Sequence, residues 1–339
     1  QLISIIDTVG LVIDTPPADL TVECDGAGNI AELQNWLITN GGASVSDPCP
    51  NSTIVWTNDF DTLQIECGAT GWALVNFTAS DDCGNSITAM ATFKIEDTVP
   101  PSATCPSDTT VVCNTDISPA VLGTATGSDA CSGLDISYSD STLNASVCNT
   151  VVERMWIVKD YCLNETTCVQ IITQIDNVPP VVTQANDESA ECNGMGSYPE
   201  MFDWLNMNGG ATATDNCTNI TWSNNYPGVE TAGCGQTKSY EIIFTATDEC
   251  GNASTTTATF SVVDTTAPDL QINANGAAVE CDGAGNIINL QNWLNSNGGA
   301  FATDECGGVT WTNDFIAITP ACGATGQAMV TFTATDDCG

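Results

Sequence analysis

The chain has 339 residues and a formal net charge of −38, because 42 acidic residues are opposed by only four basic ones. Such a chain does not bind nucleic acid, since a phosphate backbone needs a basic surface that releases its counterions. With 42% hydrophobic residues and eight Trp, the chain is not disordered either. Its length exceeds one sandwich core and favours an array of domains.

Cysteine usage points to an oxidising compartment. The chain has 18 Cys and no His, and no Cys-x-x-Cys pair occurs, which argues against zinc sites. Disulfides fit better, so we expect an extracellular or cell-surface protein. There is no apolar run long enough to span a membrane and no signal-peptide pattern at Gln1, so we expect no membrane insertion within this stretch.

A recurring junction divides the chain into repeats. Asp14-Thr-Pro-Pro is followed by similar segments beginning at Asp97, Asp176 and Asp264, and a β-branched run that proline would end precedes each of the last three. We predict that residues 1–13 end a preceding repeat. The repeats that follow are then 14–96, 97–175, 176–263 and 264–339, the last of them truncated.

The elements of the first repeat show two periodicities. Residues 29–40 have apolar residues at helical spacing, closed by Gly41 and Gly42. Residues 54–57 and 72–79 alternate as half-buried strands, and 89–95 form a last strand after a tight turn. The second repeat has 114–124 in place of the helix. We therefore predict an all-β fold of tandem Ig-like β-sandwich repeats, with a short helix inserted in repeats 1, 3 and 4.

Four cysteines recur at equivalent positions in every repeat. They are Cys24, Cys49, Cys67 and Cys83, then Cys113, Cys131, Cys148 and Cys162, then Cys192, Cys217, Cys234 and Cys250, then Cys281, Cys306, Cys322 and Cys338; the second repeat adds Cys105 and Cys168. We predict that the first pairs with the third and the second with the fourth inside each repeat, because the loops of Cys49 and Cys83 can meet at one end of a sandwich. All three connectivities of four cysteines remain possible.

One motif carries a family resemblance. The segment Ala79-Ser-Asp-Asp-Cys-Gly-Asn, matched at Ala246 and Ala334, resembles the turn of hyalin (HYR) repeats, an Ig-like module. The four cysteines per repeat and the Asp-x-x-x-Pro junction are similar to the HYR-like repeats of giant Bacteroidota surface proteins, including gliding-motility adhesins. The resemblance covers nearly the whole chain and implies extracellular adhesion without catalysis. It also implies a Cys105–Cys168 disulfide.

Acidic residues gather in the loops and at the junctions. The candidates are Asp47, Asp81, Asp82, Asp97, Asp129, Asp160, Asp176, Asp215, Asp248, Glu249, Asp264, Asp304, Asp336 and Asp337. Ca²⁺ takes six to eight oxygen ligands, so these carboxylates predict Ca²⁺ sites at the domain joints. The competing interpretation is that Asp and Asn simply form turns, and no spacing matches an EF-hand loop.

Catalysis and carbohydrate binding each compete with a plainer interpretation. Paired carboxylates can serve a glycosidase, but here they lie in repeated turns, and the lack of His and scarcity of Arg remove most other catalytic groups, so we expect no enzyme. Trp36, Trp204 and Trp293 could stack on carbohydrate, but they lie on the apolar face of the predicted helices. Core packing is therefore the expected role.

The sequence thus predicts a stalk or filament segment of a large secreted or cell-surface adhesin, stiffened by intradomain disulfides and Ca²⁺. Its partners would be other repeats of the same long chain, and surface glycans or other copies in a filament. The alternatives are a glycan- or protein-binding module and the non-catalytic tail of a secreted hydrolase.

Overall fold

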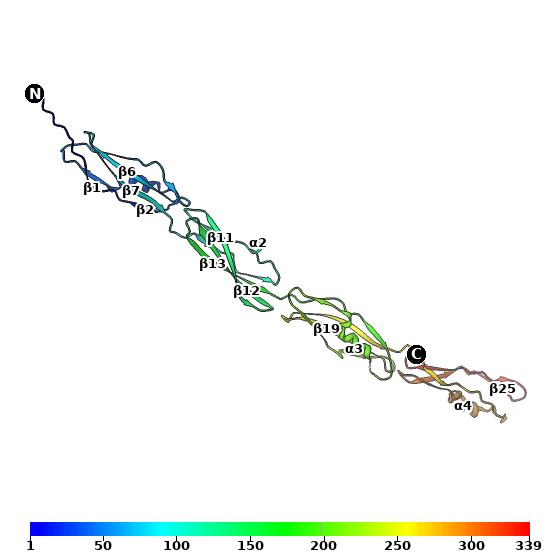
Figure 1. Ribbon diagram of the computed structural model, residues 1–339. Helices are drawn as coiled ribbons and strands as arrows, with labels where there is room; N and C mark the ends of the chain where they lie inside the picture. The colour runs from blue at the N-terminus through cyan, green and yellow to red at the C-terminus, as the bar shows by residue number, and fades with distance from the viewer. Residues whose placement is uncertain (197) are drawn as a thin grey trace. The chain divides into compact units, whose positions relative to one another are not determined.

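The computed structural model describes residues 1–196 and 198–339 and divides into two compact units, Gln1–Ile175 and Asp176–Gly339. Each unit contains two of the predicted repeats, which form separate sets of sheets (Figure 1). We call them the first to fourth repeats in chain order.

The first repeat packs a large sheet against a small one. Its elements are β1 (Val12–Thr15), β2 (Leu20–Glu23), α1 (Ile30–Ile38), a 3-10 turn η1 (Asn40–Gly42), β3 (Ser44–Ser46), β4 (Val55–Asn58), β5 (Gln64–Ile65), β6 (Gly71–Ser80) and β7 (Ser86–Glu96). The large sheet has the order β2-β7-β6-β4, with β5 on β6, and β1 pairs with β3. Strand β1 begins at Val12, before the predicted repeat boundary.

The second repeat keeps this plan with longer strands. Its elements are β8 (Ser102–Thr104), β9 (Thr109–Val112), α2 (Pro119–Leu122), β10 (Thr126–Ser128), β11 (Leu134–Ala145), β12 (Asn149–Asp160) and β13 (Glu165–Ile175). The sheet order is β11-β12-β13-β9, and β8 pairs with β10. The single helical turn α2 lies within residues 114–124, where no helix was predicted; Pro119 at its first position favours that turn.

The third repeat returns to the plan of the first, whereas the described strands of the fourth form two-stranded sheets. The third has β14 (Val181–Val182), β15 (Glu188–Glu191), α3 (Pro199–Asn206), η2 (Asn208–Gly210), β16 (Ala213–Thr214), β17 (Ile220–Asn224), β18 (Val229–Ala232), β19 (Lys238–Asp248) and β20 (Ala253–Val263). The fourth has β21 (Asp269–Ile272), α4 (Ile287–Asn295), η3 (Asn297–Gly299), β22 (Phe301–Thr303), β23 (Val309–Asn313), β24 (Thr319–Pro320), β25 (Gly326–Gln327) and β26 (Phe332–Asp336). The predicted all-β sandwiches, with a short helix in repeats 1, 3 and 4, are confirmed.

The helix tryptophan anchors each helix to the large sheet. Trp36 is 4% exposed, its ring meets that of Phe77 edge-on at 5.1 Å, and its Nε1 donates to the Ala18 carbonyl at 2.9 Å. Gly41 adopts φ 66°, and a Cβ there would lie only 2.9 Å from Pro17 Cβ, so glycine is required for this close turn. Trp204 is equally buried, so core packing is confirmed for these two indoles.

The second repeat buries a charged group. Arg154 on β12 is 1% exposed, and its Nε and Nη2 donate to the Asp140 carboxylate at 2.7 and 2.8 Å. Its Nη1 donates to the Ile117 carbonyl at 2.7 Å, and its guanidinium lies 4.6 Å from the Tyr138 ring. Because Nε, Nη1 and Nη2 each have an acceptor and the Tyr138 ring covers the guanidinium, the burial of its charge is compensated.

Replacing Trp36 with alanine tests the anchoring role. Trp36→Ala removes both the ring contact and the buried hydrogen bond, so we expect the free energy of unfolding of the first repeat to fall by about 3–5 kcal/mol. Chemical denaturation followed by circular dichroism measures it. Ile38→Ala, on the same helix and 79% exposed, is the control and should change stability by less than about 0.5 kcal/mol. Equal losses in both variants would contradict the anchoring role.

Candidate functional site at the joints between repeats

The joint between the first and second repeats is closed by two disulfides. Cys24 bonds to Cys131 with a Cα–Cα distance of 6.0 Å, and Cys67 bonds to Cys162 at 5.3 Å. The first and third cysteines of one repeat therefore pair with the second and fourth of the next. The predicted pairing inside a repeat, Cys24 with Cys67 and Cys49 with Cys83, is wrong.

The second unit repeats this arrangement. Cys192 bonds to Cys306 at a Cα–Cα distance of 5.7 Å, and Cys234 bonds to Cys338 at 5.2 Å. The reason is the position of the cysteines along each sandwich. Cys192 follows β15, which runs parallel to β20 toward the next repeat, so it lies at the leaving end. The predicted pairs Cys192–Cys234 and Cys306–Cys338 are therefore wrong as well.

The remaining cysteines fall into three groups. Cys105 and Cys168 bond to each other inside the second repeat, as the family resemblance implied. Cys113, Cys148, Cys217 and Cys250 are also disulfide-bonded. Among the described residues, free thiols are found on Cys49, Cys83, Cys281 and Cys322.

Backbone contacts accompany the disulfides. The Ala69 amide donates to the Cys131 carbonyl at 2.8 Å, and in the second unit the Gln236 amide donates to the Cys306 carbonyl at the same distance. Gly68 and Gly235 precede these amides with positive φ, and a Cβ on either would collide with the backbone of the next repeat. Adjacent repeats within a unit therefore meet through a specific surface.

A glutamate at the end of each leaving strand holds the linker. Glu23 accepts from the Thr98 amide and hydroxyl, both at 2.8 Å. Glu191 accepts from the Thr265 amide at 2.8 Å and from its hydroxyl at 2.9 Å, and these bonds lower the pKa of Glu191. These bidentate contacts fix the chain direction directly after the joint.

The aspartates of the repeated turns are bound to their own loops. Asp81 accepts from the amides of Cys83 and Asn85 at 2.9 Å and from Asn85 Nδ2 at 2.8 Å, and the Asn85 side chain, with these amides, lowers the pKa of Asp81. Asp160 and Asp248 make the same bonds to Asn164 and Asn252. Both oxygens of these three carboxylates are engaged in turn formation.

A second set of aspartates uses one oxygen in a turn. Asp47, Asp129, Asp215 and Asp304 each accept from the amide of the cysteine two residues later, at 2.7 to 2.8 Å. The other oxygen of Asp47 and of Asp215 is buried without a hydrogen-bond partner in the described structure. The same holds for one oxygen of Asp7, Asp97 and Asp264. These oxygens are the unsatisfied acceptors of the joints.

Asp97, at the junction between the first and second repeats, lies beside one aspartate of each set. Carboxylate oxygens of Asp129 and Asp160 each lie within 4.8 Å of an Asp97 oxygen. Burial raises the pKa of Asp97, and the charge of Asp129 raises it further. In the second unit, burial and the charges of Asp304 and Asp336 raise the pKa of Asp264. A cavity of about 350 Å³ there is lined by Glu191, Asp264 and Asp304, among others.

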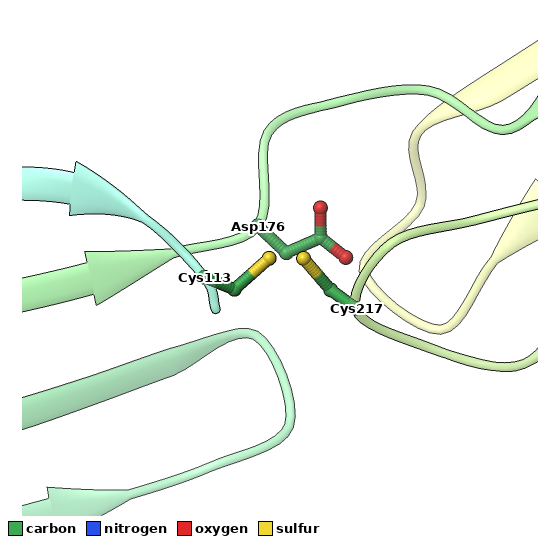
Figure 2. A group of neighbouring side chains, drawn as sticks. All are labelled: Cys113, Asp176 and Cys217. Carbon is green, nitrogen blue, oxygen red and sulfur yellow. The ribbon is translucent and has the colours of Figure 1, made fainter. Parts of the chain in front are cut away.

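The third repeat has an equivalent group. Asp176 is 7% exposed, and the Thr218 hydroxyl donates to its carboxylate at 3.2 Å. Figure 2 shows this carboxylate beside the Cys217 sulfur of the same unit. An oxygen of Asp176 and one of Asp248 lie within 4.8 Å of each other. Because the nearby cysteines are in disulfides, their sulfurs are not thiolate ligands.

Asp82, Glu249 and Asp337 are exposed. Glu249 accepts from Asn219 Nδ2 at 2.9 Å, and Asp337 accepts from the Gly308 amide at 2.8 Å. Sequence reasoning missed Asp7, Glu23 and Glu191. Asp7-Thr8-Val9 matches Asp97-Thr98-Val99, and this likeness was the available signal for Asp7.

Comparisons with known proteins add little about function. No family model and no curated protein matches the chain. Mouse cadherin-23 EC22-24 is 15% identical over 76% of this chain and 99% of its own, with a TM-score of 0.28. The human desmocollin-1 ectodomain is 11% identical over 91% and 69%, with a TM-score of 0.22. At these scores the likeness carries no argument about function.

No helix in the described part of the chain has the length and hydropathy needed to cross a bilayer.

Opposite pKa shifts predict opposite effects of two Asp→Asn changes. Because the pKa of Asp97 is raised, its ionised form costs stability above that pKa and costs nothing below the ordinary carboxyl pKa. In calcium-free buffer, Asp97→Asn should therefore raise Tm at pH 7, with the gain vanishing at acid pH. Asp81 has a lowered pKa, so Asp81→Asn should lower Tm at pH 7 and matter less as pH falls. Thermal denaturation across pH checks both signs, and a shared sign would contradict the assignment.

Proposed function

We propose that this chain is a structural stalk segment of a large extracellular adhesin, in which each repeat is locked to the next. The observation that carries the proposal is the pair of disulfides crossing the joint in each unit. A single disulfide would let one repeat rotate about that bond relative to the next repeat. Two disulfides at separate points on the same interface prevent this rotation. A chain built to transmit force or hold a distance needs this property, and a catalytic domain does not.

The location follows from the same chemistry. Disulfides form and persist in oxidising compartments, so we place the chain outside the cell or on its surface. Its surface is strongly acidic, which keeps such chains apart and soluble. We propose no catalytic activity, because the buried carboxylates recur at the joints and their neighbours are turn amides rather than proton-transfer partners.

Stacking of carbohydrate on the helix tryptophans is disfavoured. Trp36 and Trp204 are 4% and 5% exposed and have their indole N–H groups bonded to backbone carbonyls. A glycan cannot reach these rings without unfolding the repeat. A binding role would therefore use another face, and no observation singles one out.

Calcium at the joints fits the residues present. Asp97 and Asp264 each have a buried oxygen without a partner and stand beside two further aspartates. Hard oxygen donors of this kind are what Ca²⁺ binds, and its charge would neutralise carboxylates whose ionisation burial opposes. We propose that Asp97, Asp129 and Asp160 hold Ca²⁺ in the first unit, and that Asp264, Asp304 and Asp336 do so in the second.

Removing one joint's disulfides tests the locking role. The variant has Cys24, Cys67, Cys131 and Cys162 replaced by Ser. Each bond closes a loop of about 100 residues, so losing one alone costs up to about 4–5 kcal/mol in the chain-entropy model. We expect the Ala69 amide, which bonds across the joint, to exchange with deuterium at least tenfold faster. The Gln236 amide of the unaltered joint is the internal control. Unchanged protection of Ala69 would contradict locking by disulfides.

Calcium dependence is tested on the oxidised chain. A ligand that binds only the folded state raises stability by RT ln(1 + [L]/Kd), about 2.7 kcal/mol at one hundred times Kd. We expect Tm to rise with Ca²⁺ and fall back with chelator. The increase in Tm on adding Ca²⁺ should be smaller for Asp97→Asn than for the unaltered chain. For Asp82→Asn, at an exposed turn position, the increase should be the same as for the unaltered chain. If Tm does not change with Ca²⁺, the proposed Ca²⁺ sites are contradicted and these aspartates serve only to form turns.

A further inference from the structure

The second repeat has a long, uninterrupted edge strand. Strand β11 (Leu134–Ala145) lies at the end of the sheet order β11-β12-β13-β9, and the described structure places no strand on its other side. Eleven of its twelve residues are exposed. It stays in register with β12 from Leu134 to Thr142, and the first irregularity lies between Thr142 and Asn144. β11 therefore offers a straight, unpaired edge over residues 134–142.

The corresponding edge is interrupted in the first and third repeats. In the first, β4 and β5 share the edge of β6, and Asp59 between them accepts from the Asn76 amide at 2.7 Å. In the third, β17 and β18 share the edge of β19, and Asn225 between them accepts from the Ile243 amide at 2.8 Å. Short edge strands prevent pairing with other chains, as Lys and Pro on an edge also do. β11 is long and contains neither Lys nor Pro, so its edge lacks this protection.

The backbone of β11 directs alternate groups outward. The Tyr161 amide donates to the Gly133 carbonyl at 3.2 Å, which places the odd-numbered residues in the hydrogen-bonded positions of the β11–β12 ladder. The N–H and C=O groups of Ile136, Tyr138 and Asp140 therefore point away from β12. These are the groups that a further antiparallel strand would bind.

Repulsion would keep two copies of so acidic a chain apart, but the charge of this edge is locally balanced. β11 has two carboxylates, Asp135 and Asp140, and they lie directly opposite Lys159 and Arg154 of β12. Directly opposite side chains share one face of a sheet. Arg154 also binds Asp140 through two hydrogen bonds at 2.7 and 2.8 Å. Two of the four basic residues of the chain thus lie opposite this one strand.

The strand is also compatible with itself as a partner. The straight stretch is centred on Tyr138, so an antiparallel pair centred there would use its full length. Asp140 would then oppose Ile136, and Asp135 would oppose Ser141, so no two carboxylates would meet. Tyr138 is 45% exposed and would pack against the same residue of the second copy.

We propose that β11 is a docking edge at which a second copy of this chain adds its own β11, antiparallel and around a twofold axis at Tyr138. The two sheets then continue as one across the pair. An isologous contact of this kind is closed, so it joins two chains and does not polymerise. The inference rests on the proposed function, because it names the partner of a stalk segment. The disulfides of the joints take no part in the contact.

Two variants at Ile136 separate the backbone from the side chain. Ile136→Pro and Ile136→Ala both remove the apolar side chain, but only proline lacks the outward N–H, and an edge strand accepts proline at such a position. The free thiols are first alkylated with N-ethylmaleimide, so that any association is noncovalent. Sedimentation equilibrium in about 150 mM salt, which screens the net charge, measures the dissociation constant of the dimer. Thermal denaturation checks that each variant is folded.

We expect the unaltered chain to dimerise reversibly. The dissociation constant of Ile136→Pro should exceed that of Ile136→Ala by roughly tenfold, because each copy loses one hydrogen bond to the other. Equal constants for the two variants, a chain that stays monomeric at every concentration, or open-ended multimers would each overturn the proposal.

A charge exchange tests the same edge without proline. Ser137 and Ser139 oppose each other across the proposed axis, so Ser137→Glu together with Ser139→Glu should abolish dimerisation. An equimolar mixture with the chain carrying Ser137→Lys and Ser139→Lys should form heterodimers. Thr167→Glu with Val169→Glu places the same charge on the same face of the interior strand β13 and should dimerise like the unaltered chain. Loss of dimers in this control, or a mixture without heterodimers, would count against the edge. Unchanged exchange protection of the Ala69 amide in such a failure would leave the proposed function standing.

Discussion

The structure depends on covalent coupling between neighbouring repeats. A repeat of about 80 residues buries a modest core, and small domains of this kind usually need staples. Here the staples are placed across the joint rather than inside most sandwiches. Cys131 belongs to the buried core of the first repeat, and Cys306 to that of the third. These two bonds therefore stabilise a repeat with a side chain supplied by its neighbour, so that folding and alignment are coupled.

Charge sets the second constraint. Three of the four basic residues form ion pairs in the described structure, and only Arg154 is buried. The remaining carboxylates have no protein cation to neutralise them. Most meet this by accepting hydrogen bonds from turn amides, which lowers the pKa of residues such as Asp25 and Asp282. Asp97 and Asp264 each accept one such bond, at 3.3 Å, but their other oxygen is buried without a hydrogen-bond partner in the described structure, so the joints are where a divalent cation would be most favourable.

The second repeat shows how the plan tolerates variation. It replaces the helix and its tryptophan with a single turn, it buries Arg154, which pairs with Asp140, and it adds the Cys105–Cys168 disulfide. Those two cysteines pack against a small core of Ala125, Trp156 and Val158. A disulfide inside the repeat thus offsets its smaller apolar core. The cysteines that form the bonds between repeats stay at equivalent positions. The coupling surface varies less than the interior.

Local patterns in the sequence were enough to determine the repeats, their strands and the burial of Trp36, because periodicity and turn chemistry act within a few residues. Most of the joint aspartates could also be named, since each sits in a turn that its neighbours specify. The partner of each cysteine could not be. Cys24 and Cys131 are 107 residues apart and belong to different sandwiches, so only the ends at which they emerge decide that they meet. The sequence therefore determined what each repeat is, and the tertiary structure alone decided how one repeat holds the next, because disulfide pairing depends on distance in space.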